Sequence, residues 1–178
     1  DIKVIEDDDS KASDMVKIDI EADDLIGTMA KQNKDCHTVI FSSDHDLLQL
    51  VDDNIEVMLM KKGLTELEIV TPEYLKETMG IVPSQIIDLK GLMGDNSDNI
   101  PGVAGIGEKT ALKLLSEYET VENVLDHAEE IKGATGKKIQ AGKELALLSK
   151  TLATIKTDVD LDFTLEDCRF EPDYNKLI

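Results

Sequence analysis

The segment 94–115, GDNSDNIPGVAGIGEKTALKLL, changes character halfway along its length. Its first fourteen residues contain two aspartates and four glycines, whereas the residues after Gly107 have the apolar spacing of a helix. Glycines let backbone N–H groups approach a ligand closely, and the N-terminus of a following helix adds the positive end of its dipole. The segment therefore predicts a helix, a glycine-rich turn and a second helix, with carboxylates directly before the turn.

Two known nucleotide-binding motifs do not fit this turn. A P-loop needs a lysine directly after its second glycine, but Glu108 separates Gly107 from Lys109. A dinucleotide-binding turn needs a third glycine where Thr110 stands. Two interpretations remain: a phosphate-binding hairpin that Lys109 and Thr110 complete, or an ordinary tight turn between helices with glycine caps.

The composition is that of a folded protein with one core, or one core and a small satellite domain. The 178 residues are 41% hydrophobic and 32% charged. No run of apolar residues is long enough to cross a bilayer, and no basic flank precedes an apolar run at the N-terminus, so we expect a cytoplasmic protein. Cys36 and Cys168 belong to no C-x-x-C pair, which argues against a thiolate zinc site or a disulfide framework.

The negative charge is distributed unevenly. The net charge is -19, and a net charge of this sign ordinarily argues against nucleic-acid binding. Residues 1–100 carry 23 acidic against 9 basic side chains, whereas residues 101–156 carry 8 of each. The part of the chain that contains the glycine-rich turn is therefore the least repulsive toward a polyanion.

Strand and helix patterns alternate up to about residue 70, and helical patterns follow. We expect strands at 2–6, 38–42, 55–60 and 67–70, with helical spacing from Glu21 and again over 44–51. The later helices are expected at 72–79, 83–93, 107–118, 120–127 and about 137–156. The last of these presents Leu145, Leu148, Leu152 and Ile155 as one apolar stripe. This order predicts an α/β sheet followed by an all-helical region.

Carboxylates occur in three clusters, two of them where an α/β sheet or a helix is expected to end. The clusters are Glu21, Asp23 and Asp24; Asp44 and Asp46; and Asp95 and Asp98. Each cluster alone is compatible with ordinary helix capping and solvation. Clusters that come together repel one another unless a cation lies among them, and oxygen ligands suit Mg²⁺ or Mn²⁺. Two such ions about 3.5–4 Å apart are the usual apparatus for phosphodiester hydrolysis.

The acidic patterns do not form EF-hands. The pattern that begins at Asp95 lacks glycine at the sixth position and has Ile106 at the twelfth, where an EF-hand needs a glutamate. The pattern that begins at Asp158 has Phe163 and Arg169 at the same two positions. Calcium binding of the EF-hand type is therefore excluded for both.

Four ordered blocks resemble the 5′ nuclease domain of bacterial DNA polymerase I, in the flap endonuclease superfamily. They are IEADDLIGT (20–28), SSDHDLLQLV (42–51), the block from Ile86 to Leu115, and KELALLSKTLATIKTD (143–158). The resemblance implies a PIN-like α/β nuclease domain with a parallel sheet, followed by a helix-three-turn-helix region that binds DNA. It also implies a 5′-3′ exonuclease or flap endonuclease that hydrolyses DNA, or RNA primers, in replication and repair.

The resemblance also implies site residues, carried over by motif. The implied metal ligands are Glu21, Asp23, Asp24, Asp44, Asp46, Asp95 and Asp98. Among them Glu21 and Asp23 belong nearer a first divalent ion and Asp44, Asp46 and Asp95 nearer a second, and these five are the implied catalytic residues. The implied DNA-binding residues are Gly102, Val103, Gly105, Ile106, Gly107, Lys109 and Thr110. In the family the hairpin often holds a monovalent cation as well.

The chain departs from the family pattern before residue 20. The family begins with a strand that ends in an essential aspartate and continues into a basic helical arch, and neither is found here. We therefore expect residues 1–82 to be the C-terminal portion of the nuclease domain, 83–157 the DNA-binding region and 158–178 an acidic tail. Asp7, Asp8 and Asp9 are hypothesised to substitute for a lost ligand, and His45 stands where the family commonly has lysine.

Three functional hypotheses stay open at this point. The first is a two-metal nuclease that acts on DNA with a 5′ flap or 5′ end, with a polymerase covalently linked in the parent protein and no membrane partner. The second is a catalytically incomplete DNA-binding module that keeps the hairpin. The third, a PIN-type ribonuclease unrelated to replication, is disfavoured because compact PIN domains have no need of a duplex-gripping hairpin.

Overall fold

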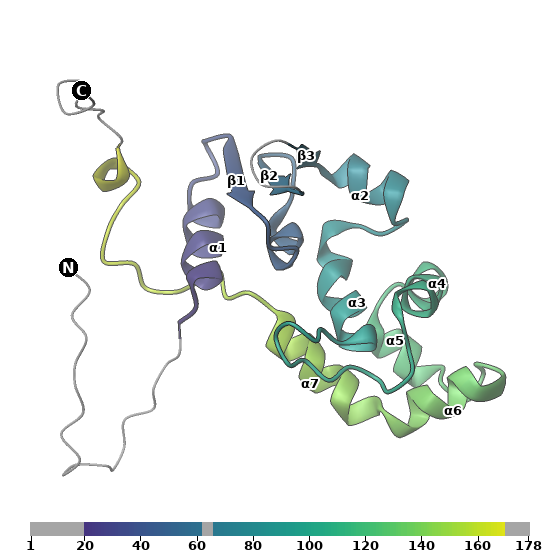
Figure 1. Ribbon diagram of the computed structural model, residues 1–178. Coiled ribbons are helices and arrows are strands. Elements are labelled where there is room, and N and C mark those ends of the chain that lie inside the picture. Colours follow the sequence, from purple (N-terminus) through teal and green to yellow (C-terminus); the bar gives the residue numbers. More distant parts are fainter. Residues whose placement is uncertain (1–19, 62–65, 170–178) are drawn as a thin grey trace, which may run out of the picture.

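The structure is a computed structural model that describes residues 20–61 and 66–169. The strand expected at 2–6 and the acidic residues 7–9 lie outside the described residues. A small sheet with helix α1 (Ala22–Gln32) beside it occupies one half of the molecule, and a group of helices forms the other half (Figure 1). Among the described residues, no helix is both long enough and apolar enough to cross a membrane.

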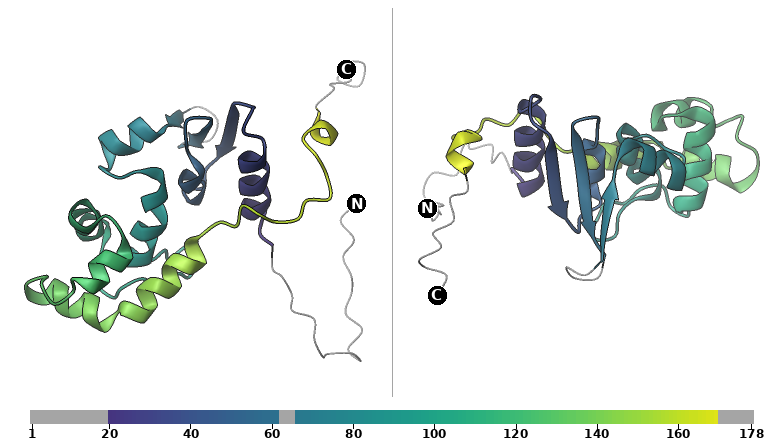
Figure 2. Two further views of the ribbon diagram at one scale, coloured as in Figure 1. Left: turned by 180° about the vertical axis from the view of Figure 1, so that it is seen from behind. Right: turned by 90° about the horizontal axis from the view of Figure 1, so that it is seen from above.

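The sheet has three strands in the order β1-β2-β3. β1 (Thr38–Ser42) runs parallel to β2 (Ile55–Met60), and β3 (Leu67–Val70) is antiparallel to β2. The three strands are those predicted, but the sheet is mixed, because the short connection between β2 and β3 permits only a hairpin. Alternate residues of β2 are buried, as the period of a strand requires. Figure 2 shows the strands side by side, with α1 next to β1.

Short helices connect the sheet to the helical region. The 3₁₀ helix η1 (Asp46–Leu50) follows β1 and buries three leucines. α2 (Pro72–Thr78) begins as predicted, with Thr71 as its cap: the Tyr74 N–H donates to Thr71 Oγ1 at 3.3 Å. η2 (Pro83–Gln85) then leads into α3 (Ile86–Met93). These connections place the C-terminus of α3 near the start of η1.

α3 is the central helix of the second half. It packs against η1, α4 (Glu108–Tyr118), α5 (Val121–Asp126) and α7 (Lys143–Ala153). A last 3₁₀ helix, η3 (Glu166–Cys168), lies near the end of the described chain. The contact with α7 is close, because a Cβ at Gly91 would lie 3.1 Å from the Ala146 carbonyl oxygen. α4, α5 and α7 are therefore all positioned by their packing against α3.

The single helix predicted at 137–156 is wrong, because the structure has two helices. α6 (Gly133–Ala141) ends at Gly142, where α7 begins. A Cβ at Gly142 would lie 2.7 Å from Val103 Cγ1, so the chain needs a glycine where it passes the hairpin. The need for a glycine at the break is thus set by a residue from a distant part of the chain.

Of the apolar stripe predicted on this segment, only Ile155 packs against the core. Leu145, Leu148 and Leu152 are 44%, 49% and 58% exposed. The buried residues of α7 are Ala146, Ser149 and Ala153. Small residues are favoured on this face because α3 lies so close to it.

The chain after α7 forms a strap across the first half of the molecule. The Lys156 N–H donates to Asp24 Oδ1 at 2.8 Å, and the Val159 N–H donates to Thr28 Oγ1 at 3.2 Å. Gln49 joins η1 to the same region, since its side chain binds both the Ala153 carbonyl and the Ile155 N–H at 2.9 Å. The strap therefore fixes α1 and η1 relative to α7.

Ser149→Ala tests the connection between α7 and the glycine-rich turn. Ser149 is fully buried, and its Oγ accepts the Gly102 N–H at 2.8 Å. Removing the hydroxyl leaves that N–H without its acceptor, so we expect the free energy of unfolding to fall by about 1–3 kcal/mol in urea denaturation. Ser116→Ala, which removes an exposed hydroxyl, should change it by less than about 0.5 kcal/mol. Equal losses for the two variants would contradict this role of Ser149.

Candidate metal centre and hairpin

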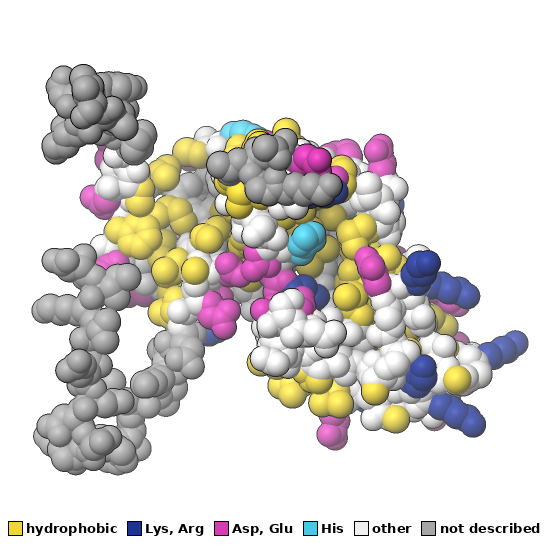
Figure 3. All heavy atoms as spheres, in the orientation of Figure 1, with side chains coloured by type: hydrophobic (Ala, Val, Ile, Leu, Met, Phe, Trp, Pro, Cys, Tyr) yellow, Lys and Arg dark blue, Asp and Glu magenta, His cyan; other side chains and the backbone are white. Residues whose placement is uncertain are grey.

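Carboxylates from two parts of the chain meet where β1 and α3 end. Carboxylate oxygens of Asp46, Asp95 and Asp98 all lie within 4.8 Å of one another. Asp46 begins η1 shortly after β1, whereas Asp95 and Asp98 lie in the loop after α3. Figure 3 shows acidic side chains gathered near the middle of the molecule, with basic ones at the far end of the helical half. The structure thus brings Asp46 of one predicted cluster together with Asp95 and Asp98 of another.

A lysine that the sequence reasoning missed lies inside this cluster. Lys90 Nζ contacts Asp46 Oδ1, and it lies 2.7 Å from Asp95 Oδ2 and 3.9 Å from Asp98 Oδ2. The Lys90 side chain is only 9% exposed, so its charge depends on these partners. The available signal was that Lys90 is the one basic residue of the mostly apolar helix segment IIDLKGLM, shortly before Asp95.

Asp95 is held in its ionised form. The hydrogen bond from Lys90 and a second one from Ser97 hold the pKa of Asp95 well below its ordinary value. Asp95 Oδ1 accepts both the N–H and the hydroxyl of Ser97, at 2.8 and 2.6 Å. The backbones of Asp95 and Ile100 exchange two hydrogen bonds, which close the loop that carries Asp98.

The remaining cluster, Glu21, Asp23 and Asp24, is affected by the negative charges of the other two clusters. Burial raises the pKa of Asp23, and the negative charges of Asp44, Glu21, Asp24 and Asp98 raise it further. Asp44 is exposed, and its Oδ1 accepts the Asp46 N–H at 2.9 Å, which orients the start of η1. Repulsion of this kind is relieved when a cation binds among the carboxylates.

Asp24 has a different environment from its neighbours. It is 7% exposed, and its two oxygens accept the backbone N–H groups of Lys156 at 2.8 Å and of Glu21 at 3.2 Å. These bonds join the N-terminus of α1 to the strap. They hold Glu21 and Asp23 beside a groove of about 300 Å³, which Asp46 and residues 151–156 also line. The metal-binding role of Asp24 stays a prediction.

The hairpin between α3 and α4 is anchored to the end of α3. Gly102 and Gly105 have φ values of 59° and 75°, in the left-handed region that favours glycine. The Val103 N–H donates to the Leu92 carbonyl at 2.8 Å, and a Cβ at Gly102 would lie 2.2 Å from the Gly94 nitrogen. The hairpin and the Asp95 loop are therefore both held by the backbone at the end of α3.

The outer side of the hairpin presents hydrogen-bond donors. Within the described residues, the backbone N–H groups of Gly105, Gly107 and Glu108 have no acceptor. Glu108 is the first residue of α4, so the positive end of that helix dipole points to the same place. Lys109, in the first turn of α4, is exposed. Such an arrangement is able to receive an anion such as a phosphate.

Solved structures of bacteriophage T5 nucleases resemble this chain. T5 5′-exonuclease with divalent metal ions (zinc) bound has a TM-score of 0.67 and 26% identity, over 78% of this chain and 51% of that one. A T5 flap endonuclease in complex with DNA and metal ions has the same TM-score, identity and coverage. The catalytic core of Rad2 in complex with DNA substrate matches at a TM-score of 0.51 and 17% identity, over 80% of this chain and 49% of that one, which shows a likeness of fold alone.

Curated relatives with higher identity are bacterial DNA polymerases. DNA polymerase I of Bacillus subtilis is 49% identical over 154 residues, which are 85% of this chain and 18% of the polymerase. DNA polymerase I of Streptococcus pneumoniae is 47% identical over 161 residues, 88% of this chain and 18% of that polymerase. The chain therefore spans less than a fifth of the length of these relatives.

Two domain families cover almost the entire chain. The N-terminal resolvase-like domain of 5′-3′ exonucleases matches residues 9–80, and the C-terminal SAM fold of 5′-3′ exonucleases matches residues 81–176. The predicted order, an α/β nuclease domain followed by a helical region, is confirmed. The chain belongs to the 5′-3′ exonuclease family.

Proposed function

We propose that this chain is the nuclease part of a metal-dependent, structure-selective 5′-3′ exonuclease and flap endonuclease. It hydrolyses phosphodiester bonds of DNA, or of RNA primers, during replication and repair. One observation carries this proposal: the carboxylate cluster of Asp46, Asp95 and Asp98 and the donor-rich hairpin are both supported by the end of α3. A group that binds phosphate and a group that binds divalent cations are thus held at a fixed separation.

The donor set of the cluster suits hard divalent cations. All three members offer carboxylate oxygens, which Mg²⁺ and Mn²⁺ prefer. Asp44, Asp46 and Asp95 would hold one ion, and Asp23 on α1 together with its N-cap residue Glu21 would hold the other. When bound, such ions supply an activated water and stabilise the charge that develops on phosphate oxygens. The protein itself fixes the ligands, because η1, α3 and the strap-held α1 are packed together.

The hairpin binds the backbone of duplex DNA next to a 5′ end or a 5′ flap. Its free N–H groups and Lys109 match phosphate oxygens, which carry no sequence information. The selectivity is then for DNA structure. A polymerase covalently linked in the parent protein, as in the relatives, would act on the same duplex. A monovalent cation in the hairpin stays a prediction.

A second candidate function is a DNA-binding module without turnover. The observation in its favour is that the ammonium of Lys90 already compensates the charge of Asp46 and Asp95. In such a module the hairpin binds the duplex while the carboxylates serve only to hold η1 and α3 together. The two functions differ in whether phosphodiester bonds are broken.

Cleavage of a labelled 5′-flap duplex in Mg²⁺ and in Mn²⁺ separates the two candidates. We expect cleavage by the chain and a loss of at least about 100-fold in the Asp44→Asn/Asp46→Asn variant, because two of the three carboxylate ligands of one ion are weakened. The matched control is Asp158→Asn/Asp160→Asn, which removes two exposed aspartates of the same spacing outside the cluster. Binding of the duplex without cleavage in either ion would favour the second candidate.

Lys90→Met tests whether a metal ion takes over the charge compensation in the cluster. Without the ammonium the three carboxylates repel one another, so we expect the metal-free protein to lose roughly 3 kcal/mol of unfolding free energy. Mg²⁺ should then raise the melting temperature more in the variant than in the wild type, because the bound ion replaces the lost charge.

Lys150→Met is the matched control for this experiment. Lys150 is also a paired, partly buried lysine, but its partners are Asp88 and Glu122, outside the cluster. Its replacement should destabilise the fold without increasing the effect of Mg²⁺. The same Mg²⁺-induced shift of the melting temperature in the wild type, Lys90→Met and Lys150→Met would contradict the placement of the metal site.

A further inference from the structure

A lysine from α6 lies against the glycine-rich turn. Lys138 Nζ donates to the Gly105 carbonyl oxygen at 2.9 Å, although the two residues are far apart in the sequence. A Cβ at Gly105 would lie 2.7 Å from Lys138 Nζ and 3.1 Å from its Cε. The ammonium therefore occupies the space beside the Gly105 Cα, which only a glycine leaves open.

The backbone that carries Lys138 is itself fixed to the hairpin. The Lys138 carbonyl accepts the Gly142 N–H at 2.9 Å, which ends α6. Gly142 in turn lies against the buried side chain of Val103, inside the hairpin. Val103 and Gly105 thus both contact the end of α6, so the position of the ammonium is set by packing as well as by its hydrogen bond.

Most of the hydrogen-bonding capacity of Lys138 is unused. An ammonium has three N–H donors, and Gly105 takes one of them. Lys138 is exposed, and no carboxylate among the described residues forms an ion pair with it. The neighbouring Gly105 N–H also has no acceptor in the described part of the chain. Donors and a positive charge therefore gather at one point of the turn.

We propose that Lys138 forms a phosphate-binding subsite together with the hairpin. One N–H of its ammonium holds the Gly105 carbonyl and so keeps the turn in its binding conformation. The other two N–H groups and the free amides of Gly105 and Gly107 bind oxygens of one backbone phosphate of the duplex. This inference rests on the proposed function, because the ligand is the phosphate of the same duplex that the nuclease cuts.

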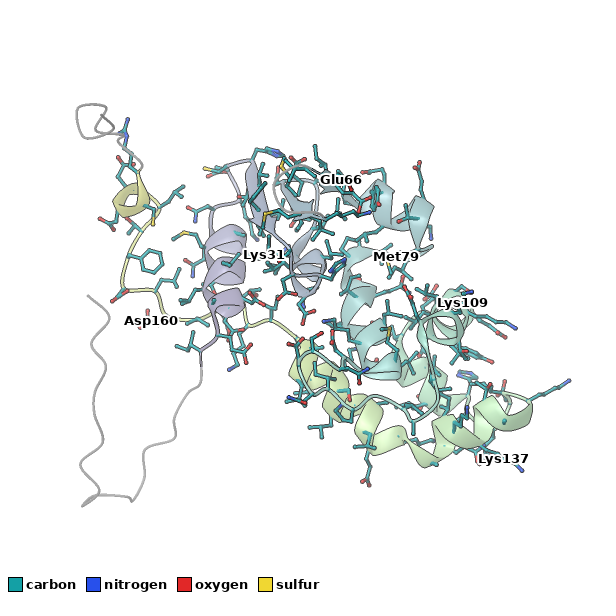
Figure 4. All side chains as sticks on the ribbon, in the orientation of Figure 1. Lys31, Glu66, Met79, Lys109, Lys137 and Asp160 are labelled. Carbon is teal, nitrogen blue, oxygen red and sulfur yellow. The ribbon has the colours of Figure 1, made fainter. Side chains whose placement is uncertain are left out.

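The neighbouring Lys137 provides an internal comparison. It has the same charge, lies on the same helix and is exposed, but it makes no contact with the hairpin that resembles the one from Lys138. Figure 4 shows Lys137 at the outer end of the helical region, where α6 lies. A general electrostatic contribution would be similar for the two lysines, whereas a phosphate subsite requires Lys138 specifically.

The test is the affinity for a fluorescent 5′-flap duplex at several salt concentrations. All variants carry Asp44→Asn/Asp46→Asn, so that the DNA stays intact in Mg²⁺. We expect Lys138→Met to weaken binding at least about 10-fold and to reduce the slope of log K against log[salt] by about 1, because one phosphate contact is lost. Lys137→Met should weaken binding less than about 3-fold, and Lys138→Arg should restore both affinity and slope, since it keeps the charge.

Each alternative result has a definite meaning. Equal effects of Lys138→Met and Lys137→Met would overturn the subsite. A loss of affinity in Lys138→Met with an unchanged salt slope would overturn it too, because the lysine would then only support the turn. If the chain with intact Lys138 fails to bind the duplex at all, the proposed function fails and the subsite fails with it. Thermal melting of each variant confirms that the proteins compared are folded.

Discussion

The buried ammonium of Lys90 is the group on which the arrangement of the carboxylates depends. An ammonium with 9% exposure is costly unless it is paired, and the oxygens of Asp46, Asp95 and Asp98 cannot gather within 4.8 Å unless a positive charge lies among them. The buried ammonium therefore needs the carboxylates as partners, and the carboxylates need the ammonium. The pairing joins η1 to α3, and so it joins the sheet half of the molecule to the helical half.

The orientation of α3 is fixed by charge on its other side as well. Asp88, two residues before Lys90, is 3% exposed, and its Oδ1 accepts the Val121 N–H at 2.8 Å and the Lys150 ammonium at 2.9 Å. α3 therefore carries one buried anion toward α5 and α7 and one buried cation toward the cluster. Rotation of the helix about its axis would leave both charges without partners.

The end of α3 sets the distance between the carboxylates and the hairpin. Gly94 ends the helix, the Asp95 loop follows, and Gly102 returns to lie against Gly94. The Gly102 N–H then binds the buried Ser149 of α7. Because these are backbone contacts in a close-packed region, the two sites have little freedom to move relative to one another.

Local patterns in the sequence were sufficient for most of the elements and for the carboxylates and glycines of the site. The alternation in β2, the Thr71-Pro72 helix start and the glycines of the hairpin each express a rule that acts over a few residues. The family resemblance added which carboxylates belong together, and the geometry now places Asp46 beside Asp95 and Asp98.

What the sequence did not reveal depends on contacts between distant segments. The closeness of Val103 explains why residue 142 is a glycine, and the closeness of α3 explains why the small residues of α7 are buried while its leucines are exposed. The mostly apolar segment around Lys90 was a local hint that its side chain is buried, but the partners that balance its charge lie on other segments of the chain. The anchoring of Asp24 to the strap was hidden for the same reason, since Lys156 lies at the other end of the described chain.

The charge distribution explains how so acidic a chain is suited to a polyanion. In water with physiological salt, charges act over a Debye length of about 8 Å, so a phosphate responds to its surroundings and not to the net charge of -19. At the hairpin the surroundings are free N–H groups, a helix N-terminus and the ammonium of Lys138. The carboxylates of Asp46, Asp95 and Asp98 outnumber the ammonium of Lys90, so in the proposed function a phosphate would approach them only after divalent cations have bound. In the proposed function, DNA is therefore held at the hairpin independently of metal, whereas its approach to the carboxylates requires metal. Binding and cleavage are then separable properties of one packed unit.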